Sequence, residues 1–261
     1  MTENQCVEFD GQKFYVSNNS LIINNSPTLK DITEIKGLES LTELKRIDIS
    51  GCKLSKIQGI KYLSNLRYLS LCNNQISEIK GINHLKNLVV LNLGRNKISK
   101  IKGLENLTKL KRLSLQLNQV RTIQGLEKNI NLEGLSLGWN NIIKMEGLEK
   151  LKKLRSLSIN CNKIDKIREI YSLPDLYELL LFNNQITRLP DLTSHPNLLT
   201  VELSSNLLAN PDDILPYIHN KNLYINLYGN PFCEELLKKG LLESGGDYTL
   251  VPLGSPHSHL E

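Results

Sequence analysis

Leucines and other apolar residues recur along the chain with one fixed period. The pattern LxxLxLxxN begins at eight leucines, each 22 residues after the one before: Leu44, Leu66, Leu88, Leu110, Leu132, Leu154, Leu176 and Leu198. An asparagine closes the pattern eight residues after the first leucine in every repeat but the first, where Cys52 takes its place. A fixed period of this length predicts a repeat architecture in which each repeat is one structural unit.

The spacing inside a repeat predicts its local structure. Numbered from the first leucine as offset 0, apolar residues are expected at offsets 0, 3, 5, 10, 13, 16 and 19, and the clear exceptions are Asn129, His195 and Pro211. Alternation of apolar and polar residues at offsets 2 to 6 predicts a short strand with one buried face. Apolar residues three apart at offsets 10 to 19 suit 3₁₀ or irregular turns on the return path. One repeat cannot bury its leucines alone, so we expect stacked repeats to share a continuous core.

Two further recurring positions have structural explanations. The asparagine at offset 8 can both donate and accept, so it can satisfy backbone groups where a strand ends. A glycine at offset 15 predicts a turn that needs positive φ or close approach between repeats. This glycine recurs at Gly59, Gly81, Gly103, Gly125 and Gly147, with Gly37 one period earlier. Later repeats place Glu169, Asp191 and Asp213 there, so we expect the turn to change shape toward the C-terminus.

The pattern as a whole predicts an α/β repeat solenoid. We expect a curved stack with a parallel β-sheet on its concave face and short 3₁₀, irregular or helical segments on its convex face. The LxxLxLxxNxI core followed by a ΦxGΦxxL tail resembles leucine-rich repeat proteins of the 22-residue subclass, over about residues 32–232. Stretches such as NKISKIKGLENLTKLKRLSL resemble the nuclear regulatory subunits of protein phosphatase-1 and the leucine-rich axonemal dynein light chains. Internalins are similar more distantly, since their tail usually carries Pro-Leu where this chain has Gly-Leu or Gly-Ile.

The open ends of such a stack need caps. We expect residues 1–43 to form an N-terminal cap and an incomplete leading repeat, and residues 44–221 to form the eight repeats. Residues 222–253 are predicted to hold the last strand and a C-terminal cap helix. Residues 254–261 resemble a cloning remnant and are left out of functional inference.

Turn and helix signals refine the two caps. Residues 14–16 and 21–23 flank Asn18-Asn19, which predicts a hairpin with an Asn-Asn turn. The Asn-Pro-Asp-Asp run at 210–213 predicts a short helix. Residues 230–240 predict a cap helix with Asn230 as its N-cap and a closing glycine.

Composition and charge exclude several function classes. Lys and Arg total 32 against 27 Asp and Glu, and this mild net charge of +5 argues against a dedicated nucleic-acid binder. We find no apolar run long enough for a membrane span and no secretory signal. Five widely spaced cysteines then favour a reducing compartment, so we expect a cytoplasmic or nuclear protein. No metal-ligand spacing, nucleotide-binding string or hydrolase motif occurs, so we expect no enzyme activity, cofactor or metal.

Function is expected on the solvent-facing offsets 1, 2, 4, 6 and 7, because the leucines are committed to the core. Exposed aromatic residues are not needed for that core and are enriched at interface hot spots. The predicted partner-binding residues on the concave face are Trp139, Tyr177, Glu178, Phe182, Glu202, Glu133, Tyr224 and Tyr228. A secondary basic patch in the earlier repeats holds Arg46, Arg67, Arg95 and Arg112. The carboxylates of the first group predict a partner surface that is basic and has an apolar pocket.

Three functions remain open at the level of sequence. The first is a monomeric, non-enzymatic scaffold or regulatory subunit that grips a folded protein on its concave face. The resemblances imply a phosphatase catalytic subunit, or a cytoskeletal or motor protein, as that partner. The second is an internalin-like surface or secreted receptor-binding domain. The third is binding of an anionic ligand or nucleic acid by the basic half.

Overall fold

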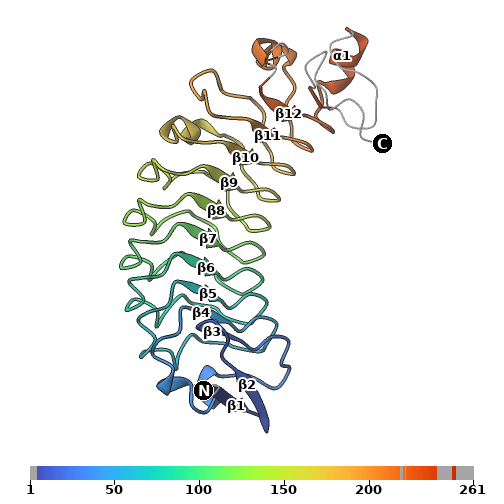
Figure 1. The fold of residues 1–261 in the computed structure, drawn as a ribbon. Coiled ribbons are helices and arrows are strands. Elements are labelled where there is room, and N and C mark those ends of the chain that lie inside the picture. The colour runs from blue at the N-terminus through green and yellow to red at the C-terminus, as the bar shows by residue number, and fades with distance from the viewer. Residues whose placement is uncertain (1–4, 218–219, 221, 240–248, 251–261) are drawn as a thin grey trace.

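The chain winds into an elongated, curved stack of rungs (Figure 1). The computed structural model describes residues 5–217, 220, 222–239 and 249–250. Ten parallel strands, β3 to β12, lie side by side in chain order, and β13 (Thr249–Leu250) pairs with β12 in the antiparallel sense. The first residues lie at one end of the stack, and helix α1 (Cys233–Lys238) lies at the other. The predicted repeat solenoid is thereby confirmed.

Each parallel strand is three residues long and pairs in register with the next. Arg46, Tyr68 and Val90, for example, stand side by side on three successive rungs. The strands are β3 (Ser20–Ile22), β4 (Arg46–Asp48), β5 (Tyr68–Ser70), β6 (Val90–Asn92), β7 (Arg112–Ser114), β8 (Gly134–Ser136), β9 (Ser156–Ser158), β10 (Glu178–Leu180), β11 (Thr200–Glu202) and β12 (Tyr224–Asn226). The fixed register means that each repeat offset becomes a straight column running across the sheet.

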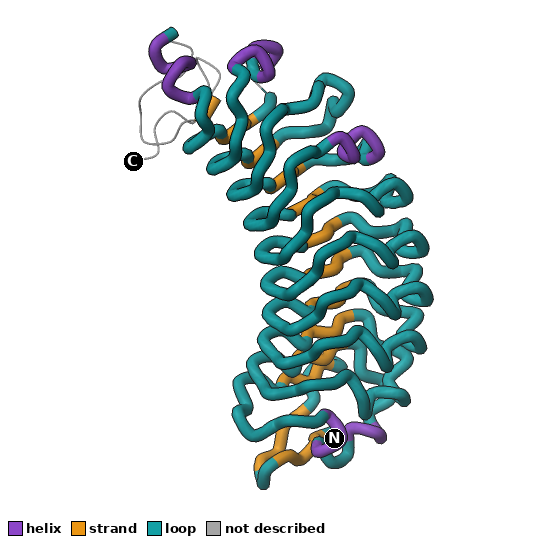
Figure 2. Tube along the Cα trace, turned by 180° about the vertical axis from the view of Figure 1, so that it is seen from behind, coloured by secondary structure: helices purple, strands orange, loops and turns teal. Residues whose placement is uncertain are grey.

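The return segments contain helical turns only toward the two ends of the stack, within the part of the chain that the structure describes (Figure 2). The middle rungs return through loops and turns, as apolar spacings of three suggested. The 3₁₀ helices are η1 (Ile32–Glu34), η2 (Leu38–Ser40), η3 (Arg168–Ser172), η4 (Pro211–Asp213) and η5 (Leu215–Tyr217). The expected short helix at 210–213 is confirmed, since the Asn210 side chain caps η4 by accepting from the Asp212 N–H.

One continuous apolar core runs through the stack from Val7 to Leu236. Two of the polar exceptions to the apolar pattern, Asn129 and His195, are buried as well. Nδ2 of Asn129 donates to the carbonyl of Leu104 at 3.0 Å, and Nε2 of His195 lies 2.8 Å from the carbonyl oxygen of Ile170. A buried polar group is tolerated when it is hydrogen-bonded, so these residues join one rung to the rung before it.

The asparagines at offset 8 form the expected ladder. Oδ1 of Asn140 accepts from the Val120 N–H at 2.9 Å, and its Nδ2 donates to the carbonyls of Leu115 and Leu137, each at 2.9 Å. The same pattern of bonds repeats from Asn74 to Asn206. Each asparagine therefore ties its own turn to the rung before it. Cys52 substitutes weakly, with its sulfur 3.8 Å from the carbonyl oxygen of Ile23.

The glycines at offset 15 meet both conditions that the sequence suggested. Gly147 has a φ of 98°, and a Cβ on it would overlap the carbonyl oxygen of Ile123 on the rung before. Gly81, Gly103 and Gly125 have positive φ and the same close approach. Only glycine combines this conformation with this lack of space.

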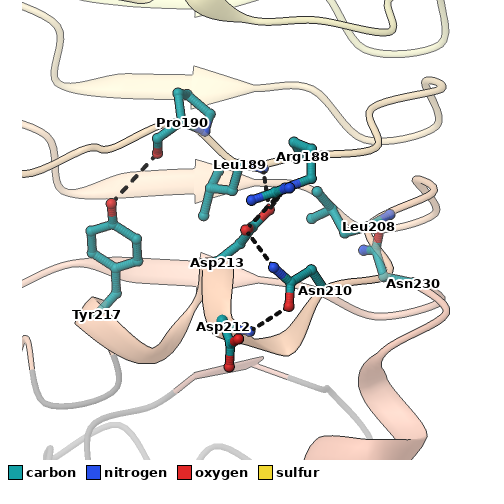
Figure 3. Close-up of polar contacts among 9 residues, drawn as sticks. All are labelled: Arg188, Leu189, Pro190, Leu208, Asn210, Asp212, Asp213, Tyr217 and Asn230. Carbon is teal, nitrogen blue, oxygen red and sulfur yellow. Dashed lines mark hydrogen bonds and ion pairs between the residues drawn. The ribbon is translucent and has the colours of Figure 1, made fainter.

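The turn changes where the glycine is lost, as expected. Asp213 occupies the offset in the eighth repeat, and its carboxylate accepts from Nε of Arg188 at 2.8 Å and from the Leu189 N–H at 3.0 Å (Figure 3). Nδ2 of Asn210 donates to the same carboxylate at 3.3 Å. The Asp213 side chain therefore does with hydrogen bonds what close backbone contact does in the earlier repeats.

The N-terminal cap corrects one prediction. The Asn18-Asn19 turn forms, with φ of 50° and 56°, and Ser17 and Ser20 exchange backbone hydrogen bonds across it. However, residues 14–16 and 21–23 do not make a hairpin. The hairpin joins β1 (Cys6–Phe9) to β2 (Gln12–Tyr15), and β3 pairs with β4 in the main sheet. The Asp-Gly pair at 10–11, a strong turn signal, sets the true hairpin, while Leu21 and Ile23 bury in the core.

The C-terminal cap corrects a second prediction. Helix α1 spans Cys233–Lys238 and its N-cap is Phe232, not Asn230. Asn230 is instead the last rung of the ladder: its Oδ1 accepts from the Leu208 N–H, and its Nδ2 donates to the carbonyls of Leu203 and Leu227. The ladder needs both amide atoms, so none is left for capping. The predicted closing residue Gly240 and the tail 254–261 lie outside the described residues.

Candidate functional site

Every rung leaves the sheet through one residue with positive φ, at offset 7. This position runs from Gly51 (72°) to Gly229 (73°), and the rungs between them show φ of 53° to 55°. Glycine and asparagine adopt this left-handed conformation cheaply, whereas other residues lose roughly 1 kcal/mol. Ser205 departs from glycine and asparagine on one later rung, and four successive rungs place other residues there: Arg95, Leu117, Trp139 and Cys161. We call these four residues the display row.

Trp139 of this row forms an aromatic pair with Phe182, which lies outside the row. The ring of Phe182 meets the ring of Trp139 edge to face, with centroids 5.8 Å apart and planes at 79°. The two residues stand two rungs apart, with Cys161 on the rung between, so their side chains lean together to make contact. Trp139 is still 46% exposed. The rings of these two predicted anchors therefore lie closer together than two rung spacings, about 10 Å, would place them.

The other predicted aromatic residues lie further along the concave face. Tyr177 stands at the start of the rung that carries Phe182 and is 48% exposed. Tyr224 and Tyr228 lie on the last rung, on and just after β12, and are also exposed. Strand β12 is the second strand after β10 in the sheet, so these tyrosines extend the candidate surface toward the C-terminal end of the stack.

The carboxylates predicted to face a partner are already engaged within the chain. Glu178 accepts from the Ser156 hydroxyl at 2.6 Å. Glu202 accepts from the Ser204 N–H and from Nδ2 of Asn226. Nζ of Lys111 lies 2.7 Å from Oε1 of Glu133. Of the three, only Glu133 is paired with a positive charge, because the donors to Glu178 and Glu202 are neutral groups.

Positive charge dominates the surroundings of Glu133. The hydrogen bond from Lys111 lowers the pKa of the Glu133 carboxyl below its ordinary value, and the charges of Arg155 and Arg112 act in the same direction. Lys111, Arg112 and Arg155 are exposed at offsets 1 and 2 of neighbouring rungs. Three cations around one carboxylate leave a net positive edge in the middle of the face.

The basic patch is divided rather than continuous. The Arg46 guanidinium lies 3.6 Å from the centroid of the Tyr68 ring and pairs with Asp48 at 3.4 Å. Arg67, Arg95 and Arg112 are exposed. Arg112 lies near the middle of the face, and Arg95 belongs to the display row. The first rung therefore contributes little free charge, and the basic residues that remain lie closer to the aromatic pair.

Sequence reasoning missed Leu117 and the small residues beside the display row. Gly138 lies next to Trp139, and a Cβ there would come within 2.6 Å of Oδ1 of Asn160. Gly134, on the same rung, has only the Cγ of Arg112 within contact range, at 3.7 Å. The available signal was the column at offset 7, in which four neighbouring repeats depart from the glycine and asparagine that the turn favours.

No group of three or more His, Cys, Asp or Glu in the part of the chain that the structure describes could hold a metal ion. Nor does any helix among the described residues have the length and apolar character to cross a bilayer.

Comparison with known proteins identifies the family. The family described as a leucine-rich repeat region matches residues 23–208, well over half of the chain. The chain therefore belongs to the leucine-rich repeat proteins, whose fold is a scaffold for protein–protein interaction. No curated protein matches the sequence.

Solved bacterial structures share the fold. An internalin C2 from Listeria monocytogenes is 29% identical with a TM-score of 0.64, over 69% of this chain and 78% of that one. A leucine-rich repeat protein of Leptospira interrogans is 26% identical with a TM-score of 0.63, over 81% of this chain and 60% of that one. The functional domain of InlJ from Listeria monocytogenes, at 22% identity and a TM-score of 0.57, shares the fold alone, over 81% of this chain and 53% of that one. The resemblance to phosphatase regulators and dynein light chains gains no support from these matches.

Proposed function

We propose that the chain is a non-enzymatic scaffold that binds a protein partner on its concave face, centred on Trp139 and Phe182. The observation that carries this proposal is the aromatic pair of exposed Trp139 and half-buried Phe182, which the core does not use. Trp139 is held in a backbone conformation that costs about 1 kcal/mol for such a residue. Strain of this kind is concentrated at functional sites, where the surrounding structure supports it.

The rigid sheet beneath the pair supports the same function. Trp139 and Phe182 follow strands β8 and β10 within three residues, and both strands are paired on both sides and braced by the asparagine ladder. A surface that is fixed before binding loses little conformational entropy when a partner docks. Aromatic anchors on such a surface are typical of interface hot spots.

An internalin-like role in receptor binding is the second candidate. It is favoured by the 29% identity and shared fold with internalin C2 over 69% of this chain. A role as a regulatory subunit rests on the sequence resemblance to phosphatase regulators, with a phosphatase catalytic subunit as the partner. The five widely spaced cysteines of the sequence favour the cytoplasmic or nuclear localisation expected of such a subunit.

Binding of an anionic ligand by the basic half has less support. Arg46 is paired with Asp48 and stacked on Tyr68, and Lys111 is paired with Glu133. These contacts reduce the free positive charge that a phosphate-rich ligand would need.

A comparative pull-down tests the proposed function. Wild type, Trp139→Ala and Phe182→Ala would each be used as bait in extract from the source organism, with bound proteins quantified by mass spectrometry. We expect one or more proteins to be lost from both variants, and calorimetry with such a protein to show a loss of about 2 kcal/mol or more. Lys97→Ala, on an exposed convex position, is the matched control and should retain the partner. Identical sets of proteins on wild type and on both aromatic variants would refute the proposal.

A further inference from the structure

The middle of the concave face has a strip of small or neutral side chains between columns of larger ones; we call this strip the trough and its small or neutral residues the floor. The floor lies at offsets 4 and 6 of the third to sixth repeats, on and just after β6 to β9. Its residues are Asn92, Gly94, Ser114, Gln116, Ser136, Gly138, Ser158 and Asn160. No aromatic or charged side chain stands on this floor, so a partner can approach close to the sheet.

One wall of the trough is apolar beyond the third repeat, where Arg95 of the display row stands. Leu117 and Trp139 stand along it on adjacent rungs, in the display row, and Phe182 closes its far end by its contact with Trp139. Leu117 is half-buried and also has a left-handed backbone, with a φ of 55°. The two strained positions that carry large apolar side chains therefore belong to the same wall.

The opposite wall is charged. Lys111, Arg112 and Arg155 project from offsets 1 and 2, and Glu133 among them is paired with Lys111. Over β6 to β9 the wall therefore carries two more positive charges than negative ones, and Glu178 on β10 adds one negative charge at its far end. A partner that fits between the walls needs an apolar side and an acidic side.

The backbone of the trough excludes an extended partner that relies on main-chain hydrogen bonds. Strands β6 to β9 are each paired on both sides, and the last parallel strand, β12, is paired with β13. A bound strand would thus find no free backbone groups in the trough. An α-helix satisfies its own backbone groups and needs none.

The dimensions of the trough also suit a helix. Five residues separate Arg112 from Leu117 on one rung, so the walls are at most about 16 Å apart at roughly 3.3 Å per residue. A helix with its side chains is about 10–12 Å wide. Four rung spacings from β6 to β10 give about 19 Å, the length of a helix of roughly 13 residues.

We infer that this trough binds an amphipathic α-helix of a partner protein, lying across the rungs with its apolar side against Leu117, Trp139 and Phe182. The helix carries acidic residues on the side that faces Arg112 and Arg155. This inference rests on the proposed function and sharpens it. It also differs from the basic partner surface predicted from sequence, because Lys111, Arg112 and Arg155 outnumber the single carboxylate of Glu133 beside them.

Selection from two peptide libraries tests the inference. Both would display 16-residue peptides on phage, one biased toward helix and the other with a central proline that prevents it. The full chain would be the target, and the winning peptides would be synthesised for binding and circular dichroism measurements. We expect winners from the helical library, with apolar residues at i, i+4, i+7 and i+11 and acidic residues beside them.

The variants place the peptide in the trough. Leu117→Asn and Trp139→Asn retain a residue suited to the left-handed backbone, so the fold is preserved while the wall is removed. We expect each to weaken the winning peptide at least tenfold, and the double variant Arg112→Ala/Arg155→Ala to weaken it severalfold and to flatten its salt dependence. Lys97→Ala should bind like wild type.

Several results would overturn the inference. These are the selection of peptides from the proline library, the selection of basic peptides, selected peptides whose binding neither wall variant changes, or no selected peptide at all. Selected peptides whose binding depends on Tyr224 or Tyr228 but not on Leu117 would contradict binding in the trough. They would still agree with protein binding by the concave face. A pull-down in which Trp139→Ala retains every partner would count against the proposed function itself.

Discussion

Trp139 and Asn140 are neighbours in the chain, yet they belong to regions with opposite requirements. Asn140 is buried in the ladder, and its amide bonds to Val120, Leu115 and Leu137. Trp139 is 46% exposed and has a conformation that suits glycine or asparagine better. The ladder is dictated by the stack, whereas the display row beside it departs from what the stack prefers.

This contrast separates stability from function in a repeat protein. A residue that the stack requires is repeated in rung after rung, and its loss is felt as unfolding free energy. A residue that works against local preference, over only a few rungs, needs another reason to be there. Repetition therefore marks the scaffold, and departures from it mark the candidate site.

The largest effect should follow from breaking a position that the stack dictates most strictly. Gly147→Ala would force a Cβ into the carbonyl oxygen of Ile123 at a φ of 98°. We expect a loss of about 3 kcal/mol of unfolding free energy in urea melts. Gly11→Ala is the control: its φ is also positive, at 71°, but no atom lies within 4 Å, so only about 1 kcal/mol should be lost. Equal losses would show that close packing of the rungs contributes nothing.

The ladder should give the next largest effect. Asn140→Ala leaves the Val120 N–H and two carbonyls without their partner in a buried turn. We expect a loss of about 1–3 kcal/mol, measured by urea unfolding. Exposed Lys97→Ala should stay within about 0.5 kcal/mol of wild type. A ladder variant as stable as the Lys97 variant would contradict the assignment.

The display row should give the smallest effect. Here one substitution should be more stable than another because it relieves backbone strain. Leu117→Ala and Leu117→Asn both remove the leucine side chain, but only asparagine suits a φ of 55°. We expect the asparagine variant to be the more stable of the two by about 0.5–1 kcal/mol. The same pair of substitutions at Gln119, which has no positive φ, should show no such advantage for asparagine. If the alanine variant is as stable as the asparagine variant, the backbone of Leu117 is not strained.

Much of this structure could be predicted from the sequence because the repeat is regular. The period fixed the rungs, the alternation fixed the strands, and the roles of the asparagine and the glycine followed from their chemistry. The candidate residues Trp139 and Phe182 were also found from exposure at strand offsets, and the structure brings their rings into contact.

The parts that could not be predicted are those where the period gives no guidance. At the N-terminus, the Asn18-Asn19 turn forms but joins no hairpin, because β3 pairs with β4 in the main sheet and Leu21 and Ile23 are buried in the core. At the C-terminus, Asn230 fits both a helix cap and a ladder rung, and only the position of the last strand shows which role it has. Glu178 accepts a hydrogen bond from Ser156, and Glu202 accepts one from Asn226. Both donors lie one rung away, so the sequence of a single repeat does not reveal these bonds.

The most direct test of the account is the unfolding free energy of Trp139→Asn in urea. The substitution removes the contact with Phe182, worth about 0.5–1.5 kcal/mol, and recovers about 1 kcal/mol by suiting the left-handed backbone. We therefore expect the variant to lie within about 1 kcal/mol of wild type, as a residue kept for binding should. A loss of about 3 kcal/mol or more, the usual result of removing a core aromatic side chain, would show that Trp139 belongs to the scaffold instead.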